Sequence, residues 1–403
     1  MITIVILTVV LIGIAFGHIP KFKMNRTTIA FSGAVILVVS GGIRYEKALT
    51  SIDNNTLVLL LSMMIINANF AVSGFFNLVS AKIIRIADTP KKLLFFIILI
   101  SGLLSSILMN DTVVLMFTPI VLQIIILIKR NPTPYLIGLG LSANIGSAMT
   151  PIGNPQNILI AGHSGISFLG FIKPLFIISI ISLLLTYFFL ILVYRKEFDK
   201  AKFKLMEAIE FRIYKPLLIK STISLTIMMI LFLMEFDISL SALIGASILL
   251  ITRRIKPERV FKEVDWSLLV FFASLFVITG VAIETGLDKK LFHIFEKTIF
   301  QNYLNLSFFT AILSNLVSNV PAVMILSPFI KLMDNAYVYW LVVAMSSTFA
   351  GNLTIIGSVA NIIVVEIARK KGVYISFFEF LKIGVFITII TILLGSFWLQ
   401  MLY

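Results

Sequence analysis

The chain has 403 residues, of which 59% are hydrophobic and only 13% are charged, and its mean hydropathy is +1.06. Because soluble domains carry roughly 25% charged residues, this composition excludes an ordinary soluble protein and indicates an all-α integral membrane protein. The net charge of +14 falls in short loops between apolar runs, which favours an orientation signal over nucleic-acid binding, and the lack of cysteine excludes disulfides and thiolate metal sites.

Ten apolar runs have about the length that a helix needs to cross roughly 30 Å of hydrocarbon. The first follows the initiator Met without a basic region or a small-residue cleavage site, so we expect a membrane span there and not a signal peptide. The ten runs cover residues 2–17, 27–43, 55–79, 135–162, 167–194, 215–234, 238–252, 266–285, 337–368 and 374–402.

Two further apolar stretches, 93–128 and 305–330, are too long for one helix and are broken at their middle by polar residues or proline. Each predicts either two full spans or one re-entrant hairpin. With either choice the strongly basic loops share one face, which we expect to be cytoplasmic, and both termini then lie outside the plasma membrane.

The second half of the chain repeats the first. The polar tips favour the re-entrant hairpin. Each copy then contains five spans and one hairpin, and five is odd, so the copies are predicted to lie in the membrane with opposite orientation. The expected organisation is a first inverted repeat over 1–194, a cytoplasmic linker over 195–214 and a second repeat over 215–403. Matching residues recur at offsets of 212, 209 and 204 residues, as in Gly33 and Gly245, Asn110 and Asn319, and Thr150 and Thr354.

Two predicted spans contain helix breakers. Pro151 and Pro155 bracket Gly153 in the first copy, and Gly351, Asn352 and Gly357 interrupt the second. Opened helix ends supply carbonyls that can coordinate Na⁺ and amides that can hold an anion. Hydrogen bonding between helices is the alternative role for the amides. The candidate substrate and ion residues are Asn110, Asp111, Thr112, Thr150, Gly153, Asn154, Asn157, Ser318, Asn319, Thr354, Gly357, Ser358 and Asn361.

Asp111 is the most informative single residue, because a carboxylate near the middle of a membrane costs roughly 2.5–3.5 kcal/mol. It could bind Na⁺ together with Asn110 and Asn319, accept a proton, or cap the second helix of its hairpin. The second copy carries Val320 and Pro321 at the matching positions, so the two tips differ chemically. Asn67 and Glu284 are weaker site candidates. His18, His163 and His293 are expected in loops and receive no role.

The first half contains the segments NDTVVLMFTP and TPIGNPQNI, and the second half contains SNVPAVMILSP and GNLTIIGSVANI at the matching positions. Through these segments the sequence resembles the ion transporter superfamily, in its arsenite permease, NhaD-type antiporter and citrate-transporter-like branch. The resemblance implies a scaffold domain, usually dimeric, and a transport domain with two hairpins and two unwound helices that moves as an elevator. Dicarboxylate-transporting relatives carry Ser-Asn-Thr at each tip. Here Asn110-Asp111-Thr112 and Ser318-Asn319-Val320 depart from that pattern, and arsenite-permease relatives with an Asn-Asp pair are closer.

The sequence therefore predicts a secondary active transporter of a small anion or oxyanion, either arsenite or antimonite or an inorganic or carboxylate anion, coupled to H⁺ or Na⁺. A Na⁺/H⁺ antiporter is the alternative. No paired carboxylates or other catalytic pattern predicts an enzyme, and no cofactor is expected beyond the coupling ion. The expected partners are the lipid bilayer, the substrate and a second copy of the chain. The sequence has no P-loop motif, so the chain itself is not predicted to hydrolyse ATP. A separate ATPase subunit stays an open alternative.

Overall fold

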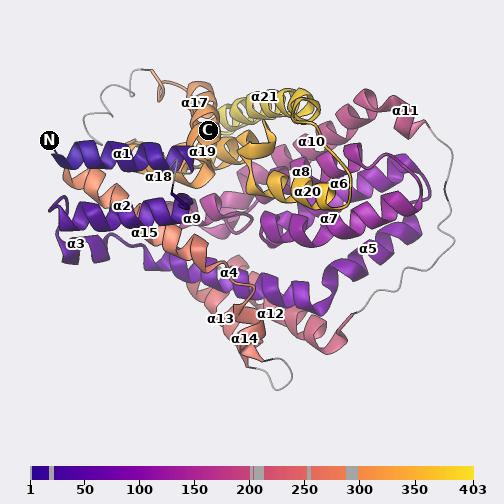
Figure 1. Cartoon of the computed structure of the whole chain (residues 1–403), viewed down its shortest axis with the longest axis horizontal. Coiled ribbons are helices and arrows are strands. Elements are labelled where there is room, and N and C mark those ends of the chain that lie inside the picture. Colours follow the sequence, from indigo (N-terminus) through magenta and orange to yellow (C-terminus); the bar gives the residue numbers. More distant parts are fainter. Residues whose placement is uncertain (1, 18–21, 200–202, 204–212, 252–255, 287–297) are drawn as a thin grey trace.

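The structure is a computed structural model that describes residues 2–17, 22–199, 203, 213–251, 256–286 and 298–403. The described residues are largely helical and contain no β-strand, as expected (Figure 1). Seven of the described helices are long and apolar enough to cross a membrane, and six shorter apolar helices accompany them. Most of the 195–214 linker, together with His18 and His293, lies outside the described residues.

The described residues of the first half form ten helices. The predicted run 55–79 is divided because Gly74 adopts a φ of +78°, a left-handed conformation that ends one helix and begins the next. The helices are α1 (Ile2–Phe16), α2 (Arg26–Val39), α3 (Tyr45–Thr50), α4 (Asn54–Ser73), α5 (Phe75–Ile86), α6 (Pro90–Ile107), α7 (Asn110–Leu127), α8 (Thr133–Ser147), α9 (Pro155–Ser164) and α10 (Phe168–Val193).

After the short α11 (Arg195–Phe198), the described helices of the second half follow the same order, without a described counterpart of α5. The sequence offsets place each described helix opposite one helix of the first half, so α12 matches α1 and α21 matches α10. The elements are α12 (Lys215–Leu233), α13 (Ile238–Leu250), α14 (Pro257–Phe261), α15 (Trp266–Glu284), α17 (Tyr303–Val317), α18 (Asn319–Ile330), α19 (Ala336–Ala350), η1 (Ile355–Gly357), α20 (Val359–Lys370) and α21 (Phe377–Leu402).

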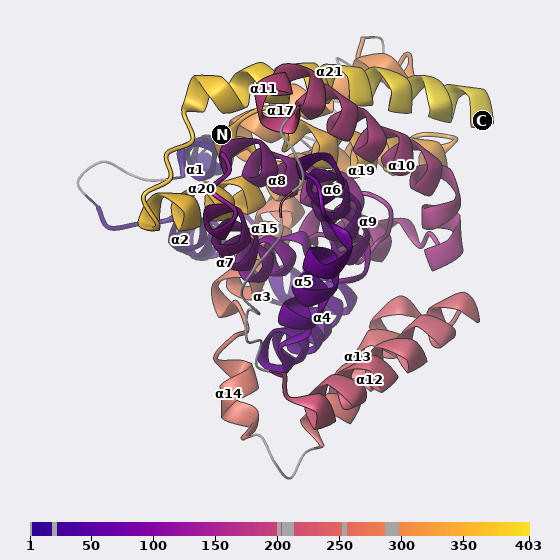
Figure 2. The same cartoon turned by 90° about the vertical axis from the view of Figure 1, so that its right-hand side faces the viewer.

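The contacts between the halves are reciprocal. Helix α2 packs against α15 and, correspondingly, α13 packs against α4; α20 packs against α7 and α9 packs against α18. Figure 2 shows α12 and α13 as a pair beside α4, at the opposite edge of the molecule from α10 and α21. Exchanging the halves turns these four contacts into one another. The orientation of the copies in a membrane stays a prediction.

Loops that the charge pattern assigns to one face lie together. Ser239 Oγ donates to the carbonyl of Asn55 at 3.0 Å, and Lys47 forms an ion pair with Glu284. At the other end of the helices, Lys91 lies 3.7 Å from Asp199. The grouping of the loops therefore agrees with the charge pattern, while which face is cytoplasmic stays a prediction.

Helices α6 and α8 cross at two glycines. A Cβ atom on Gly146 would overlap the backbone of Gly102, so this crossing admits no side chain at Gly146. Ser101 Oγ and Ser142 Oγ lie 2.5 Å apart one turn earlier and form a buried hydrogen bond across the same pair of helices. The close approach sets the distance between the first broken stretch and α8.

Replacing Gly146 by Ala should destabilise the protein by about 1–3 kcal/mol, because the backbone of Gly102 cannot move aside as a flexible side chain can. The matched control is Gly138→Ala in the same helix, where a Cβ would meet only the side-chain ends of Leu190, Leu94 and Ile98 at 3.1 to 3.3 Å. Thermal unfolding of the purified protein in detergent measures both. An equal effect of the two substitutions would contradict the close helix crossing.

Candidate functional site

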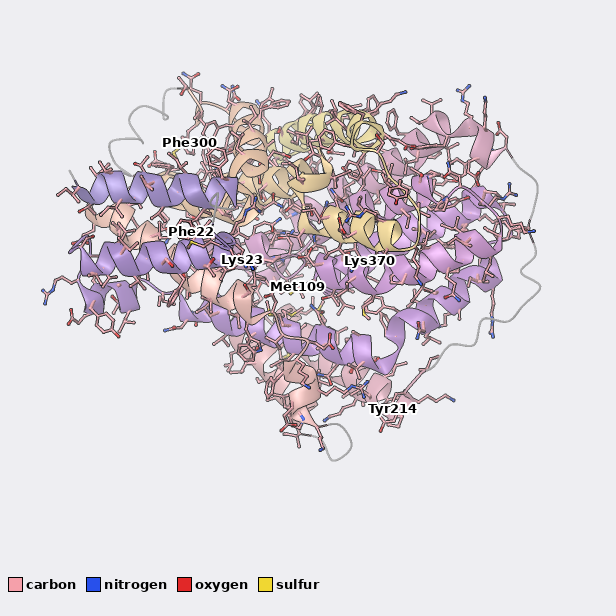
Figure 3. All side chains as sticks on the ribbon, in the orientation of Figure 1. Phe22, Lys23, Met109, Tyr214, Phe300 and Lys370 are labelled. Carbon is pink, nitrogen blue, oxygen red and sulfur yellow. The ribbon has the colours of Figure 1, made fainter. Side chains whose placement is uncertain are left out.

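Each hairpin tip docks on the helix break of its own half. The α6–α7 turn contains Leu108 and Met109, after which the Asn110 amide donates to the carbonyl of Gly153, 3.0 Å away, between α8 and α9. In the second half, Asn315 Nδ2 donates to the carbonyl of Ala350 at 2.9 Å, where α19 ends. Met109 lies in the interior of the molecule (Figure 3) and is 5% exposed. The tips therefore meet the breaks inside the protein, and the choice between a re-entrant hairpin and two full spans stays a prediction.

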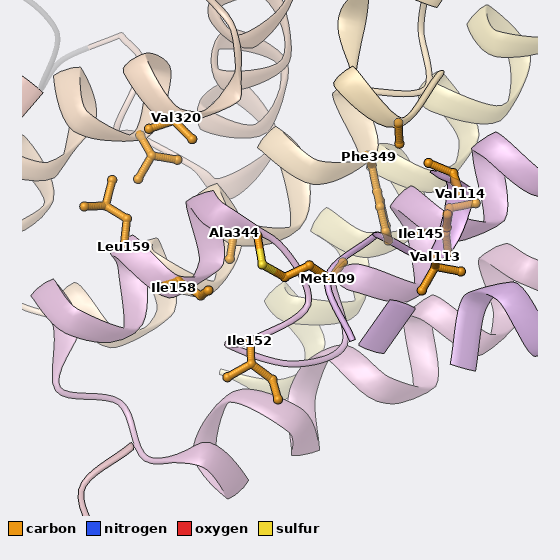
Figure 4. Close-up of a cluster of buried hydrophobic side chains, with 14 of the residues drawn as sticks. Met109, Val113, Val114, Ile145, Ile152, Ile158, Leu159, Val320, Ala344 and Phe349 are labelled. Atoms are coloured by element: carbon orange, nitrogen blue, oxygen red, sulfur yellow. The ribbon is translucent and has the colours of Figure 1, made fainter. Parts of the chain in front are cut away.

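Apolar side chains surround this junction of tips and breaks. They come from the first hairpin, both breaks and the second hairpin, and Figure 4 shows them around the unwound backbone. Such surroundings lower the local dielectric and remove water from the unwound backbone. The labelled members are Met109, Val113, Val114, Ile145, Ile152, Ile158, Leu159, Val320, Ala344 and Phe349.

Two asparagines satisfy the carbonyls that the breaks release. Asn157 in α9 and Asn361 in α20 are both fully buried, and each amide nitrogen donates to carbonyls ten and seven residues earlier. Since an unpaired backbone group in hydrocarbon costs several kcal/mol, these side chains hold the breaks open. The acceptors are Ser147 O at 3.1 Å and Thr150 O at 3.0 Å for Asn157, and Gly351 O at 2.8 Å and Thr354 O at 3.3 Å for Asn361.

The other candidates beside the breaks also satisfy local backbone. Asn154 Oδ1 accepts from the amide of Asn157 at 2.8 Å and caps α9, and Ser358 Oγ accepts from the amide of Ala360 at 3.2 Å and caps α20. Thr150 Oγ1 donates to the carbonyl of Ser106 at 2.5 Å. The hydrogen-bonding alternative from the sequence therefore describes part of what these side chains do.

Several polar atoms at the junction are buried without a hydrogen-bond partner in the described part of the chain. They include Asn110 Oδ1, Asn157 Oδ1 and Asn352 Nδ2. Buried polar groups are nearly always paired, so such atoms need an explanation, and a bound ligand supplies one. Together these atoms offer two acceptors and one donor to a polar ligand.

A second group of oxygens converges at Gly357. A Cβ on this glycine would lie 2.7 Å from Asn315 Oδ1, 3.1 Å from the Gly351 carbonyl and 3.3 Å from Thr354 Oγ1. Asn315 Oδ1 and Thr354 Oγ1 are also without a partner among the described residues. The missing side chain of Gly357 leaves room among neutral oxygens, the ligand type that hard cations prefer.

Asp111 lies in the first turn of α7, with its side chain partly buried. The N-cap is Met109 and no side chain makes a capping hydrogen bond there, so the capping role considered for Asp111 is wrong. Within the described residues it has no hydrogen bond or ion pair, although the positive end of α7 favours its charge. Thr112 follows it, also partly buried. The carboxylate is thus available to an ion or a proton.

Helix ends of both polarities meet at the junction. The N-termini of α7, α9, α18 and α20 lie at the tips and breaks, and so do the C-termini of α6, α8, α17 and α19. N-terminal amides favour an anion, while C-terminal carbonyls favour a cation. The backbone alone therefore offers both kinds of contact.

The second tip has a strained backbone. Ser318 has φ +78° and ψ 159°, a region that is essentially restricted to glycine. The matching residue of the first tip, Met109, has ordinary angles of −59° and 133°. Next to Ser318, Asn319 Oδ1 accepts from Ser314 Oγ at 2.8 Å. The oxygen of Asn319 is therefore already engaged, unlike that of Asn110.

Other predicted residues lie apart from the junction or in different elements. Glu284 ends α15 and pairs with Lys47, with both side chains partly exposed. Asn67 is buried in the middle of α4 with both polar atoms unpaired among the described residues. His163 lies in the last turn of α9 and not in a loop, with Nδ1 3.4 Å from Ser327 Oγ.

Sequence reasoning missed polar residues in the helices that lead into the breaks. Asn144 in α8 and Thr348 in α19 are 2% exposed and separated by the same 204 residues as the break motifs. Asn144 Oδ1 accepts from Asn110 Nδ2 at 3.1 Å, and Thr348 Oγ1 accepts from Asn154 Nδ2 at 3.1 Å. The recurrence at this offset is the signal that could have identified them.

Replacing Asn157 by Leu should destabilise the protein by about 1–3 kcal/mol, because two buried carbonyls lose their donor. Asn67→Leu is the control, because its amide has no partner to lose among the described residues, and it should be neutral or stabilising. Thermal unfolding in detergent compares the two. A smaller loss for Asn157→Leu than for Asn67→Leu would refute the assigned role of Asn157.

Glycine at position 318 should stabilise the protein by about 1 kcal/mol, because it adopts the observed backbone angles without strain. The matching change Met109→Gly should destabilise it, since that residue is unstrained and its buried side chain would be lost. Unfolding temperatures of both variants test the difference. Destabilisation by Ser318→Gly would show that the tip is not strained in the protein.

The chain is similar to known membrane proteins over most of its length. A family model described as "Citrate transporter" matches residues 7–338. The "46 kDa membrane protein" of Mycobacterium leprae is 30% identical over 97% of this chain and 97% of its own length. The "Silicon efflux transporter LSI3" of Oryza sativa subsp. japonica is 28% identical over 88% of this chain and 87% of its own.

A solved structure shares the fold. The YdaH transporter of Alcanivorax borkumensis superimposes with a TM-score of 0.64 and 12% identity, over 100% of this chain and 96% of that one. With seven helices long and apolar enough to span a membrane, these matches indicate a multi-pass membrane transporter and not an enzyme. The matched model covers most of the chain, which therefore belongs to the citrate transporter family.

Proposed function

We propose that the chain is a secondary active transporter of a small anion or oxyanion, coupled to H⁺ or Na⁺, and that it binds its substrate where the tips and breaks meet. The observation that carries the proposal is the convergence of four helix N-termini beside buried amides with unpaired atoms. Amides and helix dipoles hold an anion without a buried cation, which favours a small ligand of low charge.

We base the proposed substrate class on the polar groups at the junction and not on the names of the relatives. The family name specifies citrate and the rice relative's name specifies silicon, so these names do not agree on one solute. Amide and hydroxyl groups recognise oxygen-rich solutes in general. We propose an oxyanion or oxyacid of the arsenite or antimonite kind, or a small inorganic or carboxylate anion.

For coupling, we propose the first tip. Asp111 and the unpaired Oδ1 of Asn110 provide a charged and a neutral oxygen next to each other in the chain, suited to Na⁺ or, through the carboxylate, to a proton. Asn319 is the third proposed Na⁺ ligand, and its oxygen would first have to give up its hydrogen bond from the Ser314 hydroxyl. The oxygens around Gly357 are a further place for a cation.

The proposed architecture is that of an elevator with inverted repeats. The reciprocal packing of α2 with α15 and of α4 with α13 supports a scaffold that is distinct from the hairpins and broken helices. We propose that the protein is a homodimer in the plasma membrane with both termini outside. If the protein depended on a separate ATPase subunit, transport would require ATP.

A Na⁺/H⁺ antiporter is the second candidate, favoured by the unpaired carboxylate of Asp111. An antiporter of this kind would use more than one carboxylate in the cavity, and the further candidate, Glu284, is paired with Lys47. Proteoliposomes that move protons in response to a Na⁺ gradient, with no transported anion present, would favour the antiporter over anion transport.

Asp111→Asn should abolish gradient-driven accumulation while leaving downhill exchange of the substrate. Proteoliposomes with an imposed Na⁺ or pH gradient, given arsenite, silicic acid, citrate or sulfate in turn, measure both activities. Glu284→Gln is the control and should keep coupling, because this carboxylate is already paired with Lys47. Unchanged coupling in Asp111→Asn would remove the carboxylate from the mechanism, and uptake that ignored both gradients would refute secondary active transport.

A further inference from the structure

Asn144 forms hydrogen bonds with residues of the second half that lie 208 to 217 positions further along the chain. It lies in α8, which leads into the first break, yet three of its four partners belong to the second break. The fourth partner is Asn110 at the first tip. One side chain thus touches the first hairpin and the break of the opposite half.

The amide group of Asn144 is fully used. Its oxygen accepts from Asn110 Nδ2 at 3.1 Å and from Ser358 Oγ at 2.9 Å. Its nitrogen donates to Asn352 Oδ1 at 3.0 Å and to Asn361 Oδ1 at 3.4 Å. Two donors and two lone pairs are all that a carboxamide offers, and among the other side chains only glutamine, which is one carbon longer, carries the same group.

Thr348 makes the reciprocal connection. It lies in α19, which leads into the second break, but its hydroxyl accepts from Asn154 Nδ2 at 3.1 Å and from Gln156 Nε2 at 3.2 Å, both in the first half. Asn154 and Ser358 are the N-caps of α9 and α20. Each entering helix therefore contacts the N-cap of the opposite break.

We propose that Asn144 and Thr348 are positioning residues that make the shape of each break depend on the entering helix of the opposite half. The two half-sites then form one unit, and a change at the first tip reaches the second break through Asn110 and Asn144. The inference rests on the proposed function only in treating the breaks as the ligand site.

Hydrogen–deuterium exchange of the full-length protein in lipid nanodiscs tests the crossed dependence without any ligand. Asn144→Ala should accelerate exchange in residues 351–358 by about tenfold or more, while residues 148–154 keep their rates. Thr348→Val, which removes only the hydroxyl, should do the opposite. A loss of overall stability would instead accelerate exchange in both breaks together.

The matched control is Asn69→Ala, whose amide donates to Ile65 O within its own helix, so both breaks should be unaffected. Equal acceleration of both breaks by Asn144→Ala, or acceleration confined to its own half, would overturn the proposal. If that variant fails to fold, Asn144→Gln keeps both donors and both accepting lone pairs of a carboxamide, and should show a smaller acceleration at 351–358. Because the experiment uses no substrate or gradient, failure of the transport proposal would leave its result unchanged.

Discussion

The structure depends on one constraint, which is that backbone groups released at a helix break inside an apolar environment must find partners within the protein. Asn157 and Asn361 meet it by donating to two carbonyls each, and Asn154 and Ser358 meet it by capping the helices that resume. With those groups satisfied, the chain can leave helical conformation twice and turn its helix ends toward a common point. The hairpin tips and the crossing of α6 with α8 are arranged around these breaks.

The same constraint is met differently in the two halves. The first break contains Pro151 and Pro155, which remove amide donors, and its tip is relaxed and carries a carboxylate. The second break has no proline and contains a turn of 3₁₀ helix, η1, while the tip holds Ser318 in a strained conformation. Strain persists only where the surroundings over-determine it. The two halves therefore share the hydrogen bonds that satisfy the broken helices. They differ at the hairpin tips, where only the first carries a carboxylate.

The positions of the breaks could be predicted because proline and glycine act locally and the repeated motif marks both copies. The roles of single polar residues could not, because they depend on which helix lies opposite. Asp111 is at a helix start in sequence, yet the structure shows no capping bond from it. Asn144 lies in an apolar run with no breaker beside it, and only the packing of the halves brings Ser358 and Asn352 to it. His163 was misplaced because α9 continues to Ser164.

Helix ends of opposite polarity at one junction have a consequence for the proposed transport. A cation near the C-terminal carbonyls and an anion near the N-terminal amides would attract each other in a low dielectric, so each would bind better with the other present. The unpaired Asn110 and Asn157 oxygens lie in the first turns of α7 and α9, and the unpaired Asn352 nitrogen lies just past the end of α19. These side chains therefore add, at each kind of helix end, the polarity that the backbone there lacks. Since Asn144 contacts both Asn110 and Asn352, a cation that engages Asn110 and an anion that engages Asn352 would act on the same side chain. Ion coupling in this protein would then be a property of the hydrogen-bonded junction as well as of the charge on Asp111.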